Sequence, residues 1–337
     1  MMDVSDPPRT DAAIEVAHLR KCYGDLVAVE DVSFSVAEGE IFGILGPNGA
    51  GKTTTVECIT GLRHPDAGRL RVLGLNPLTD DAELHEMVGV QLQDSQLPGL
   101  LRVREILRLY RSFYRNPADA DEILEILGLA DKSNALYKSL SGGQKQRLSI
   151  ALALIGRPKV AVLDEMTTGL DPAARRGTWD FIESVRDRGT TMILVTHFMD
   201  EAQRLCDRVA LIDRGRIAAT GTPRQIADQA GGGKRVRFAP DKPFNDDLLT
   251  TLPEVSGLDR HGGHVVVSGS GQLVNAVIST LAGAGITAND VEMESATLED
   301  AFIWLTGSHL HDPGADADAD VDAAEAAVKS TRKLVRR

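Results

Sequence analysis

The chain has 337 residues, of which 42% are hydrophobic, 26% charged and only 4% aromatic. This composition is typical of soluble globular proteins, and the length favours about two domains. The formal net charge of -12 argues against broad nucleic-acid binding, which requires a basic surface.

The sequence contains no run long enough to cross a membrane, which needs about 18 uninterrupted apolar residues. The best candidate, residues 148–163, is interrupted by charged residues and a proline. The polar, acidic start of the chain lacks the apolar segment of a secretory signal. Cys22, Cys58 and Cys206 show no C-x-x-C spacing, which predicts reduced thiols in a cytoplasmic protein. Any role at a membrane is therefore expected to need a partner.

Short apolar runs alternate with helical patterns over the first two thirds of the chain. Strands are predicted at residues 14–20, 41–45, 88–93, 160–163, 192–195 and 209–212. Helices are predicted from residue 51 toward 61, over two amphipathic stretches between 103 and 129, and near 172–188 and 199–205. The alternation, with strands apolar throughout, predicts an α/β domain over residues 13–230 with a mainly parallel sheet. We interpret the helical block at about residues 95–156 as an inserted subdomain.

A glycine triplet at residues 231–233 predicts a linker, after which the pattern restarts. Strands are predicted at residues 234–238, 265–267 and 291–293, and helices at 273–281 and 297–305. This order predicts a small α+β domain of βαββαβ character over residues 234–307, with Thr297 capping its last helix. Residues 1–12 and the charged tail 308–337 are predicted to be disordered.

A complete phosphate-loop pattern, G-x-x-x-x-G-K-[ST], follows the strand predicted at residues 41–45. It comprises Gly46, Pro47, Asn48, Gly49, Ala50, Gly51, Lys52 and Thr53, with Thr54 next in the chain. Its glycines let backbone N–H groups converge on phosphate oxygens at the start of a helix. Lys52 is expected to reach the β- and γ-phosphates, and Thr53 to bind Mg²⁺.

Two acidic residues, Asp164 and Glu165, follow the strand predicted at residues 160–163. They would lie at the carboxyl edge of the sheet, where open α/β sheets bind ligands. Asp164 fits the role of a Mg²⁺ ligand, and Glu165 that of a general base for water. The structural alternative is a strand that ends in solvated charges, and the phosphate loop in the same chain favours the functional interpretation.

A further motif, Ser141, Gly142, Gly143 and Gln144, opens the helix that runs to Gly156. Ser141 and Gln144 have the spacing of a capping box, so an ordinary helix start would explain them. Glycine inside a helix costs about 1 kcal/mol relative to alanine, and two adjacent glycines indicate that a ligand approaches the backbone there. The helix start predicts a second anion site.

With residues 140–144 reading LSGGQ, the sequence resembles the ATP-binding subunits of ATP-binding cassette (ABC) transporters. The motif order matches this family over about residues 13–230. The resemblance implies a P-loop NTPase fold, in which a RecA-like core carries an antiparallel β subdomain and an inserted helical subdomain. It makes Tyr23 the adenine-stacking aromatic, Gln93 the Mg²⁺-sensing glutamine, Asp171 the dimer-contacting aspartate and His197 the switch histidine.

One position departs from the family pattern: Met166 follows the acidic pair where proline is usual. Proline would fix a turn rather than do chemistry, so we expect altered local stiffness and no loss of activity.

The resemblance also implies how such a protein works. Two ATPase subunits, expected to be identical copies, would pair head to tail, with each ATP between one phosphate loop and the other signature. The cofactors would be ATP and Mg²⁺. Glu165 would polarise the attacking water and His197 would hold it in line, while Lys52 and Gln93 complete the catalytic set.

The sequence LEDAF at residues 298–302 resembles the end of the ABC-2 type drug-resistance exporters, the daunorubicin-resistance group. This resemblance implies efflux of a drug, lipid or related compound through a separate membrane permease. The subunit would be cytoplasmic and peripheral on the inner face of the plasma membrane.

Two other functions compete with this one. Soluble ABC ATPases of DNA repair, chromosome maintenance or translation need basic surfaces, paired cassettes or long coiled coils, whereas this chain has one cassette and a charge of -12. We therefore expect no nucleic-acid partner. A non-hydrolysing regulatory subunit is the second alternative, and the presence of Glu165 and His197 argues against it.

Overall fold

The computed structural model describes residues 12–91, 97–168, 170–229, 234–269, 271–294 and 297–306. The chain divides into two compact units, of which the first ends at Thr222 and the second begins at Pro223. The boundary precedes the glycine triplet because the helix that starts at Pro223 belongs to the second unit. Ala12, which the sequence places in a disordered end, is the first residue of a strand. The predictions for residues 1–11 and 308–337 lie outside the described residues.

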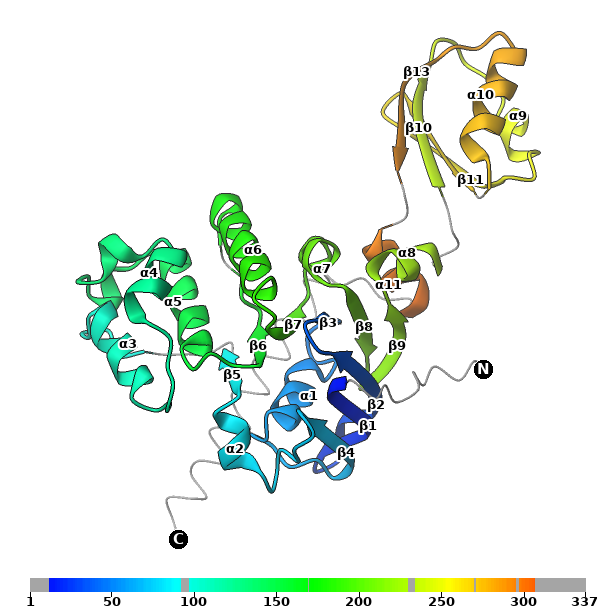
Figure 1. Ribbon diagram of the computed structural model, residues 1–337. Helices are drawn as coiled ribbons and strands as arrows, with labels where there is room; N and C mark the ends of the chain where they lie inside the picture. The colour runs from blue at the N-terminus through cyan, green and yellow to red at the C-terminus, as the bar shows by residue number, and fades with distance from the viewer. Residues whose placement is uncertain are drawn as a thin grey trace. The chain divides into compact units, whose positions relative to one another are not determined.

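The first unit is built on a nine-stranded sheet with the order β4-β1-β2-β9-β8-β3-β7-β6-β5 (Figure 1). Its strands are β1 (Ala12–Tyr23), β2 (Leu26–Ala37), β3 (Ile41–Leu45), β4 (Ala67–Val72), β5 (Val88–Gln91), β6 (Val160–Asp164), β7 (Thr191–Thr196), β8 (Arg208–Asp213) and β9 (Arg216–Gly221). Strands β5, β6, β7, β3 and β8 are parallel. Strands β1, β2 and β4 pair antiparallel, and β9 returns antiparallel to β8. The predicted α/β class with a mainly parallel core is confirmed.

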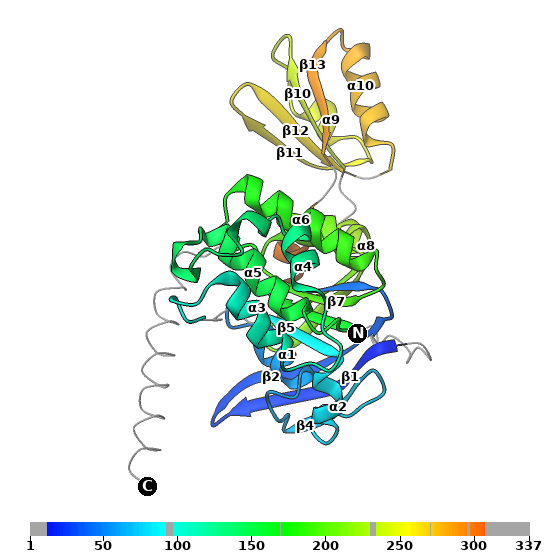
Figure 2. The same ribbon diagram turned by 60° about the vertical axis from the view of Figure 1, so that its left-hand side comes forward.

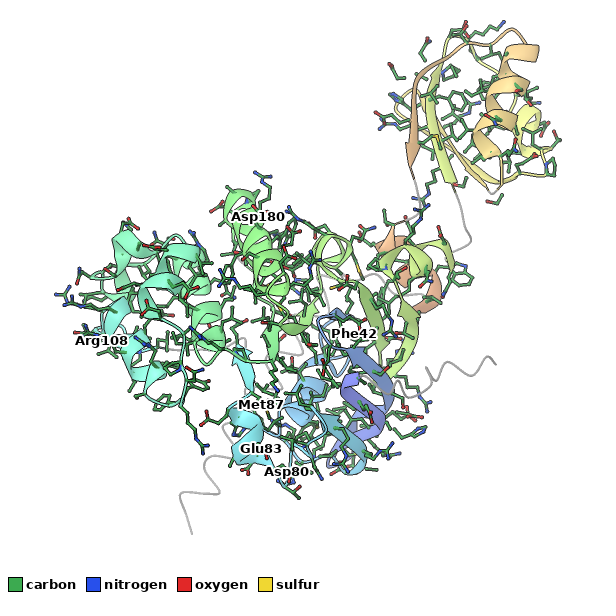
Figure 3. The ribbon with its side chains drawn as sticks, in the orientation of Figure 1. Phe42, Asp80, Glu83, Met87, Arg108 and Asp180 are labelled. Atoms are coloured by element: carbon green, nitrogen blue, oxygen red, sulfur yellow. The ribbon has the colours of Figure 1, made fainter. Side chains whose placement is uncertain are left out.

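The central strands are short and apolar because helices and loops cover both of their faces. Every residue of β3, β6 and β7 is buried, which is the pattern of a parallel sheet enclosed on both sides. Phe42 of β3 stacks on Phe34 with ring centroids 4.9 Å apart. Figure 3 shows Phe42 inside the unit, while Arg108 and Asp180 point outward from two of its helices. The core therefore holds the carboxyl ends of these strands at a fixed edge.

The helices of the first unit fall into two groups. Those interleaved with the sheet strands are α1 (Lys52–Ile59), α2 (Asp81–His85), α6 (Pro172–Arg186) and α7 (Met199–Leu205). A separate group beside β5 contains α3 (Val103–Arg111), α4 (Ala120–Ile126) and α5 (Gly142–Leu154), with short 3₁₀ turns at Ala130–Lys132 and Tyr137–Ser139 (Figure 1). Helices α3, α4 and α5 pack on one another through apolar faces such as Val103, Ile106 and Leu107. This group corresponds to the helical subdomain expected from the sequence.

The second unit contains the predicted βαββαβ order. Its elements are α8 (Pro223–Gln229), β10 (Lys234–Pro240), α9 (Asp247–Thr250), β11 (Val255–His261), β12 (His264–Gly269), α10 (Leu273–Gly283), β13 (Ala288–Glu294) and α11 (Leu298–Thr306). The antiparallel sheet has the order β11-β12-β10-β13, and Figure 2 shows it with α9 and α10. Phe238, Val267 and Val277 lie in its core. Thr297 caps α11, since its hydroxyl accepts the Asp300 N–H at 3.1 Å, as predicted.

Within the described residues, no helix combines the length and the apolar character needed to cross a bilayer. Cys22, Cys58 and Cys206 are all described and are free thiols.

Candidate nucleotide-binding site

The phosphate loop connects β3 to α1 at the carboxyl edge of the sheet. Glycine is required at two positions for reasons of space and backbone angle. A Cβ atom on Gly46 would lie 2.1 Å from the carbonyl oxygen of Ile212. Gly51, at the start of α1, has a φ of 99° and would place a Cβ 2.3 Å from the carbonyl oxygen of Ala28. Such left-handed backbone favours glycine, so the loop curls closely against its neighbouring strands.

Lys52 is the first residue of α1 and is only 6% exposed. Its Nζ donates hydrogen bonds to the carbonyl oxygens of Gly46 at 2.9 Å and Pro47 at 3.0 Å. Burial lowers the pKa of this ammonium, while the nearby carboxylates of Glu165 and Asp164 oppose that shift. The Lys52 ammonium is thus held along the loop by backbone carbonyls and lies near two acids at the end of β6.

Asp164 ends β6 beside the phosphate loop and is 1% exposed. Its Oδ2 accepts a hydrogen bond from the Thr53 hydroxyl at 3.3 Å. Its Oδ1 is buried and has no hydrogen-bond partner among the described residues. Burial, together with the charge of Glu165, raises the pKa of Asp164 to about 6. A buried carboxylate oxygen without a donor, beside a threonine hydroxyl, is the hard oxygen chemistry that Mg²⁺ prefers.

Glu165 and His197 form a pair between adjacent strand ends. The Glu165 Oε1 lies 3.3 Å from the His197 Nδ1, and β6 and β7 are neighbours in register at Asp164 and Val195. Glu165 has a φ of 49°, and its N–H donates to the carbonyl of Val195 at 2.9 Å. The hydrogen bond from His197 is the main reason that the pKa of Glu165 is lowered. Glu165 is therefore held as a carboxylate by the residue that the sequence analysis pairs with it.

The signature opens α5 with the capping box expected from its spacing. The Ser141 N–H donates to the Gln144 side chain at 3.0 Å, and the Gln144 N–H donates to the Ser141 hydroxyl at 3.3 Å. A Cβ on Gly142 would meet no atom within 4 Å, whereas one on Gly143 would lie 3.2 Å from the Cβ of Ala174. Gly143 is therefore explained in part by packing on α6, whereas no contact among the described residues explains Gly142.

Asp171 and Tyr23 occupy positions with clear local roles. Asp171 caps α6, accepting the N–H groups of Ala173 at 3.0 Å and Ala174 at 2.9 Å through one carboxylate oxygen. Tyr23 ends β1 with 38% of its surface exposed. The Arg63 guanidinium lies 5.2 Å from the centre of its ring.

Three positions complete the comparison with the sequence predictions. Gln93, expected at the metal and in catalysis, lies outside the described residues; β5 ends two residues earlier, at Gln91. Met166 is 1% exposed and packs inside the unit. Sequence reasoning missed Glu201 of α7, which is also 1% exposed and accepts a hydrogen bond from the Trp179 indole at 3.0 Å. Helix α7 has an apolar face, and an acidic residue within that face is the sequence signal that could have identified Glu201.

A phosphate loop after one parallel strand, acids after a second and a histidine after a third define a P-loop nucleotide hydrolase. Residues 29–168 match the family model described as ABC transporter. The chain is 36% identical over 305 residues to the daunorubicin resistance ATP-binding protein DrrA3 of Streptomyces coeruleorubidus, covering 88% of this chain and 96% of the relative. It is 37% identical over 310 residues to the Nod factor export ATP-binding protein I of Burkholderia orbicola, covering 89% of this chain and 99% of the relative.

Solved structures agree with these relatives. An ATP-binding subunit of an ABC transporter is 29% identical with a TM-score of 0.60, covering 65% of this chain and 94% of its own. A dimeric ATP-binding cassette in a post-hydrolysis state, bound to ADP and Pi, is 26% identical with a TM-score of 0.57, covering 62% and 98%. The chain belongs to the family of ATP-binding subunits of ABC transporters, and it is an ATPase. The family predicted from the motifs, including its likeness to drug-resistance subunits, is confirmed.

Proposed function

We propose that this chain drives an exporter, converting ATP hydrolysis into efflux of a drug, lipid or related compound through a separate ABC-2 type permease. The two curated relatives are named for daunorubicin resistance and Nod factor export, and each aligns along nearly its whole length. The first unit would be the hydrolytic cassette and the second an accessory unit. The subunit would work at the cytoplasmic face of the plasma membrane.

The observation that carries the chemistry is the pair of carboxylates at the end of β6, Asp164 and Glu165, which have different environments. Asp164 is buried beside Thr53, and its Oδ1 has no hydrogen-bond partner in the part of the chain that the structure describes, so these two residues would hold Mg²⁺, with Gln93 as a further ligand. The metal would neutralise charge on the β- and γ-phosphates. Lys52 would exchange its loop carbonyls for phosphate oxygens. The backbone N–H groups of the phosphate loop, together with Thr54, would surround the phosphates.

Glu165 has the environment of a base. His197 stabilises its carboxylate form, so Glu165 can accept a proton from a water that attacks the γ-phosphorus. The bond between that phosphorus and the bridging oxygen breaks, and ADP and inorganic phosphate leave. His197 would hold Glu165 in line with the γ-phosphate, and most of the rate gain would come from positioning and charge neutralisation.

A second copy of the chain would complete the site. Ser141 and Gly142 are exposed at this helix start, and a Cβ on Gly142 would meet no described atom within 4 Å, which suits a phosphate arriving from another molecule. A similar cassette has been solved as a dimer. Tyr23 would stack on adenine, while Asp171 would contact the partner. ATP would favour the closed pair because it gains contacts there that the open state lacks.

Co-expression with an ABC-2 type permease tests this function. We expect the full chain to be retained on detergent-solubilised, affinity-tagged permease, and phosphate release to change when the permease is present. The Lys52→Ala variant serves as the control for nucleotide-dependent turnover. ATPase activity that responds only to DNA or ribosomes, with no retention by the permease, would contradict the exporter.

A further inference from the structure

Glu201 is a buried acid four residues beyond His197, on α7. Only 1% of it is exposed. Burying a carboxyl group is strongly unfavourable unless hydrogen bonds replace its water. An apolar residue at this position of α7 would pack without that cost, so the acid must make contacts that an apolar residue cannot.

Donors from several elements surround the Glu201 carboxylate. The indole Nε1–H of Trp179, on α6, donates to its Oε1 at 3.0 Å. The hydroxyl of Thr196, the last residue of β7, also donates to the carboxylate. Burial raises the pKa of Glu201, and hydrogen bonding with Thr196, Trp179 and Thr167 acts against that rise. The carboxylate thus bridges the end of β7 and the middle of α6.

The Thr196 hydroxyl extends this bridge to the other side of His197. Its oxygen accepts the N–H of Phe198 at 3.0 Å while its hydrogen faces Glu201. A single relay therefore runs from the Phe198 amide through Thr196 to Glu201. Thr196 and Phe198 are the residues on either side of His197. The ring of His197 lies 4.1 Å, centre to centre, from that of Phe198. The backbone turn that carries His197 is fixed by this relay.

Surface contacts between α6 and α7 surround the buried one. Arg175 of α6 pairs with Asp200 at 3.3 Å, and Arg204 of α7 bonds to Asp180 and Glu183. Asp180 lies on the outward side of α6 (Figure 3). These pairs are partly exposed, and ion pairs in contact with solvent contribute little. Arg175 also lies over the Phe198 ring, 4.4 Å from its centre, whereas Glu201 reaches the same turn through buried hydrogen bonds.

We infer that Glu201 is a positioning residue for ATP hydrolysis, because it clamps the Thr196–Phe198 turn and so keeps the His197 ring at 3.3 Å from Glu165. It touches neither nucleotide nor water and acts through His197. The inference rests on the proposed roles of Glu165 and His197 in the same site.

Glu201→Gln is the sharpest variant because it keeps the size of the side chain. Glutamine offers one acceptor oxygen where the carboxylate offers two, and it turns an N–H₂ group toward the remaining donor. If the amide oxygen keeps the Trp179 indole, the relay at Thr196 is broken. We expect kcat of the full-length chain to fall about tenfold, the loss of one well-placed hydrogen bond, with KM for ATP within about twofold of the original.

A double-mutant cycle with His197→Ala separates positioning from simple stabilisation. If Glu201 acts through His197, Glu201→Gln lowers kcat in the original chain and adds nothing in the His197→Ala chain. An equal fold-loss in both backgrounds overturns the inference. His197→Ala with full kcat would instead refute the proposed role of His197 itself, which is a separate failure. Glu183→Gln, which removes a surface contact between the same helices, is the matched control and is expected to leave kcat unchanged.

Variants of Thr196 test the relay independently. They can be used even if His197→Ala has no measurable turnover, in which case the double-mutant cycle could not be read. Thr196→Val keeps the shape but removes the hydroxyl, so it should reproduce the kcat loss of Glu201→Gln without changing KM. Thr196→Ser restores the hydroxyl and should recover most of the activity. Original kcat in Thr196→Val, or no recovery in Thr196→Ser, would contradict the relay.

Discussion

The phosphate-loop edge and the signature helix differ in how completely this chain builds them. At the sheet edge, Lys52 is 6% and Asp164 1% exposed, and their partners all come from the same unit. At the start of α5, Ser141 and Gly142 are exposed and are held only by a helix cap. The first region is a folded site of one chain, and the second is a prepared surface. The difference explains why a second copy would be needed for hydrolysis but not for the first contact with ATP.

The largest expected effect lies at the buried edge. Lys52→Ala should weaken ATP binding about 1,000-fold, or about 4 kcal/mol, because it removes the cation aimed at the phosphates. Titration calorimetry on the full chain measures this. Lys242→Ala, at an exposed lysine of the second unit, is the control and should bind normally. Full ATP affinity in Lys52→Ala would refute the assignment of the loop.

Asp164→Asn should change stability with pH. Because the folded pKa of Asp164 is about 6, above the 3.8 that is usual for aspartate, the folded state holds a proton that the unfolded state releases between these pH values. In the absence of metal, stability should therefore fall as pH rises through this window. Asparagine carries no charge to bury, so the variant should be more stable above pH 6, by up to about 3 kcal/mol.

Denaturant unfolding without metal, between pH 4 and pH 8, checks this prediction. The advantage of Asp164→Asn should shrink toward pH 4 and vanish below it. Mg²⁺ should stabilise the original chain above pH 6 and leave the variant unaffected. A variant that loses stability at every pH would show that Asp164 is structural and does not await a cation.

The smallest expected effects concern Ser141 at the start of α5. They separate its role as a helix cap from its proposed contact with nucleotide. Ser141→Ala should lower kcat about tenfold through the lost phosphate contact, and it should cost about 1 kcal/mol of stability through the lost cap. Asp119→Ala uncaps α4 of the same helical group, where Asp119 accepts the Asp121 and Glu122 amides. It should cost similar stability with no change in kcat. Equal kcat losses in the two variants would make the signature serine merely a helix cap.

The same contrast governs what the sequence could reveal. Strands such as β3, β6 and β7 were predictable because every position is apolar and buried. The strands β4, at Ala67–Val72, and β9, at Arg216–Gly221, were not, because most of their residues are partly exposed and their pattern mixes charge with apolar side chains. Local motifs identified Lys52 and Asp164. Glu201 was missed because its partners lie on other elements, with Trp179 on α6 and Thr196 on β7, and no local spacing pattern links them to it.

A Glu165 variant tests the central claim most directly. The claim is that two copies of the chain enclose ATP and that hydrolysis through Glu165 opens the closed pair. In Glu165→Gln, ATP binding should persist while hydrolysis stops, so the closed pair should accumulate. Light scattering during gel filtration with saturating Mg-ATP measures the mass directly. We predict the mass of two chains for Glu165→Gln, and of one chain when Lys52→Ala is added. A Glu165→Gln chain that binds Mg-ATP yet stays monomeric would contradict the account.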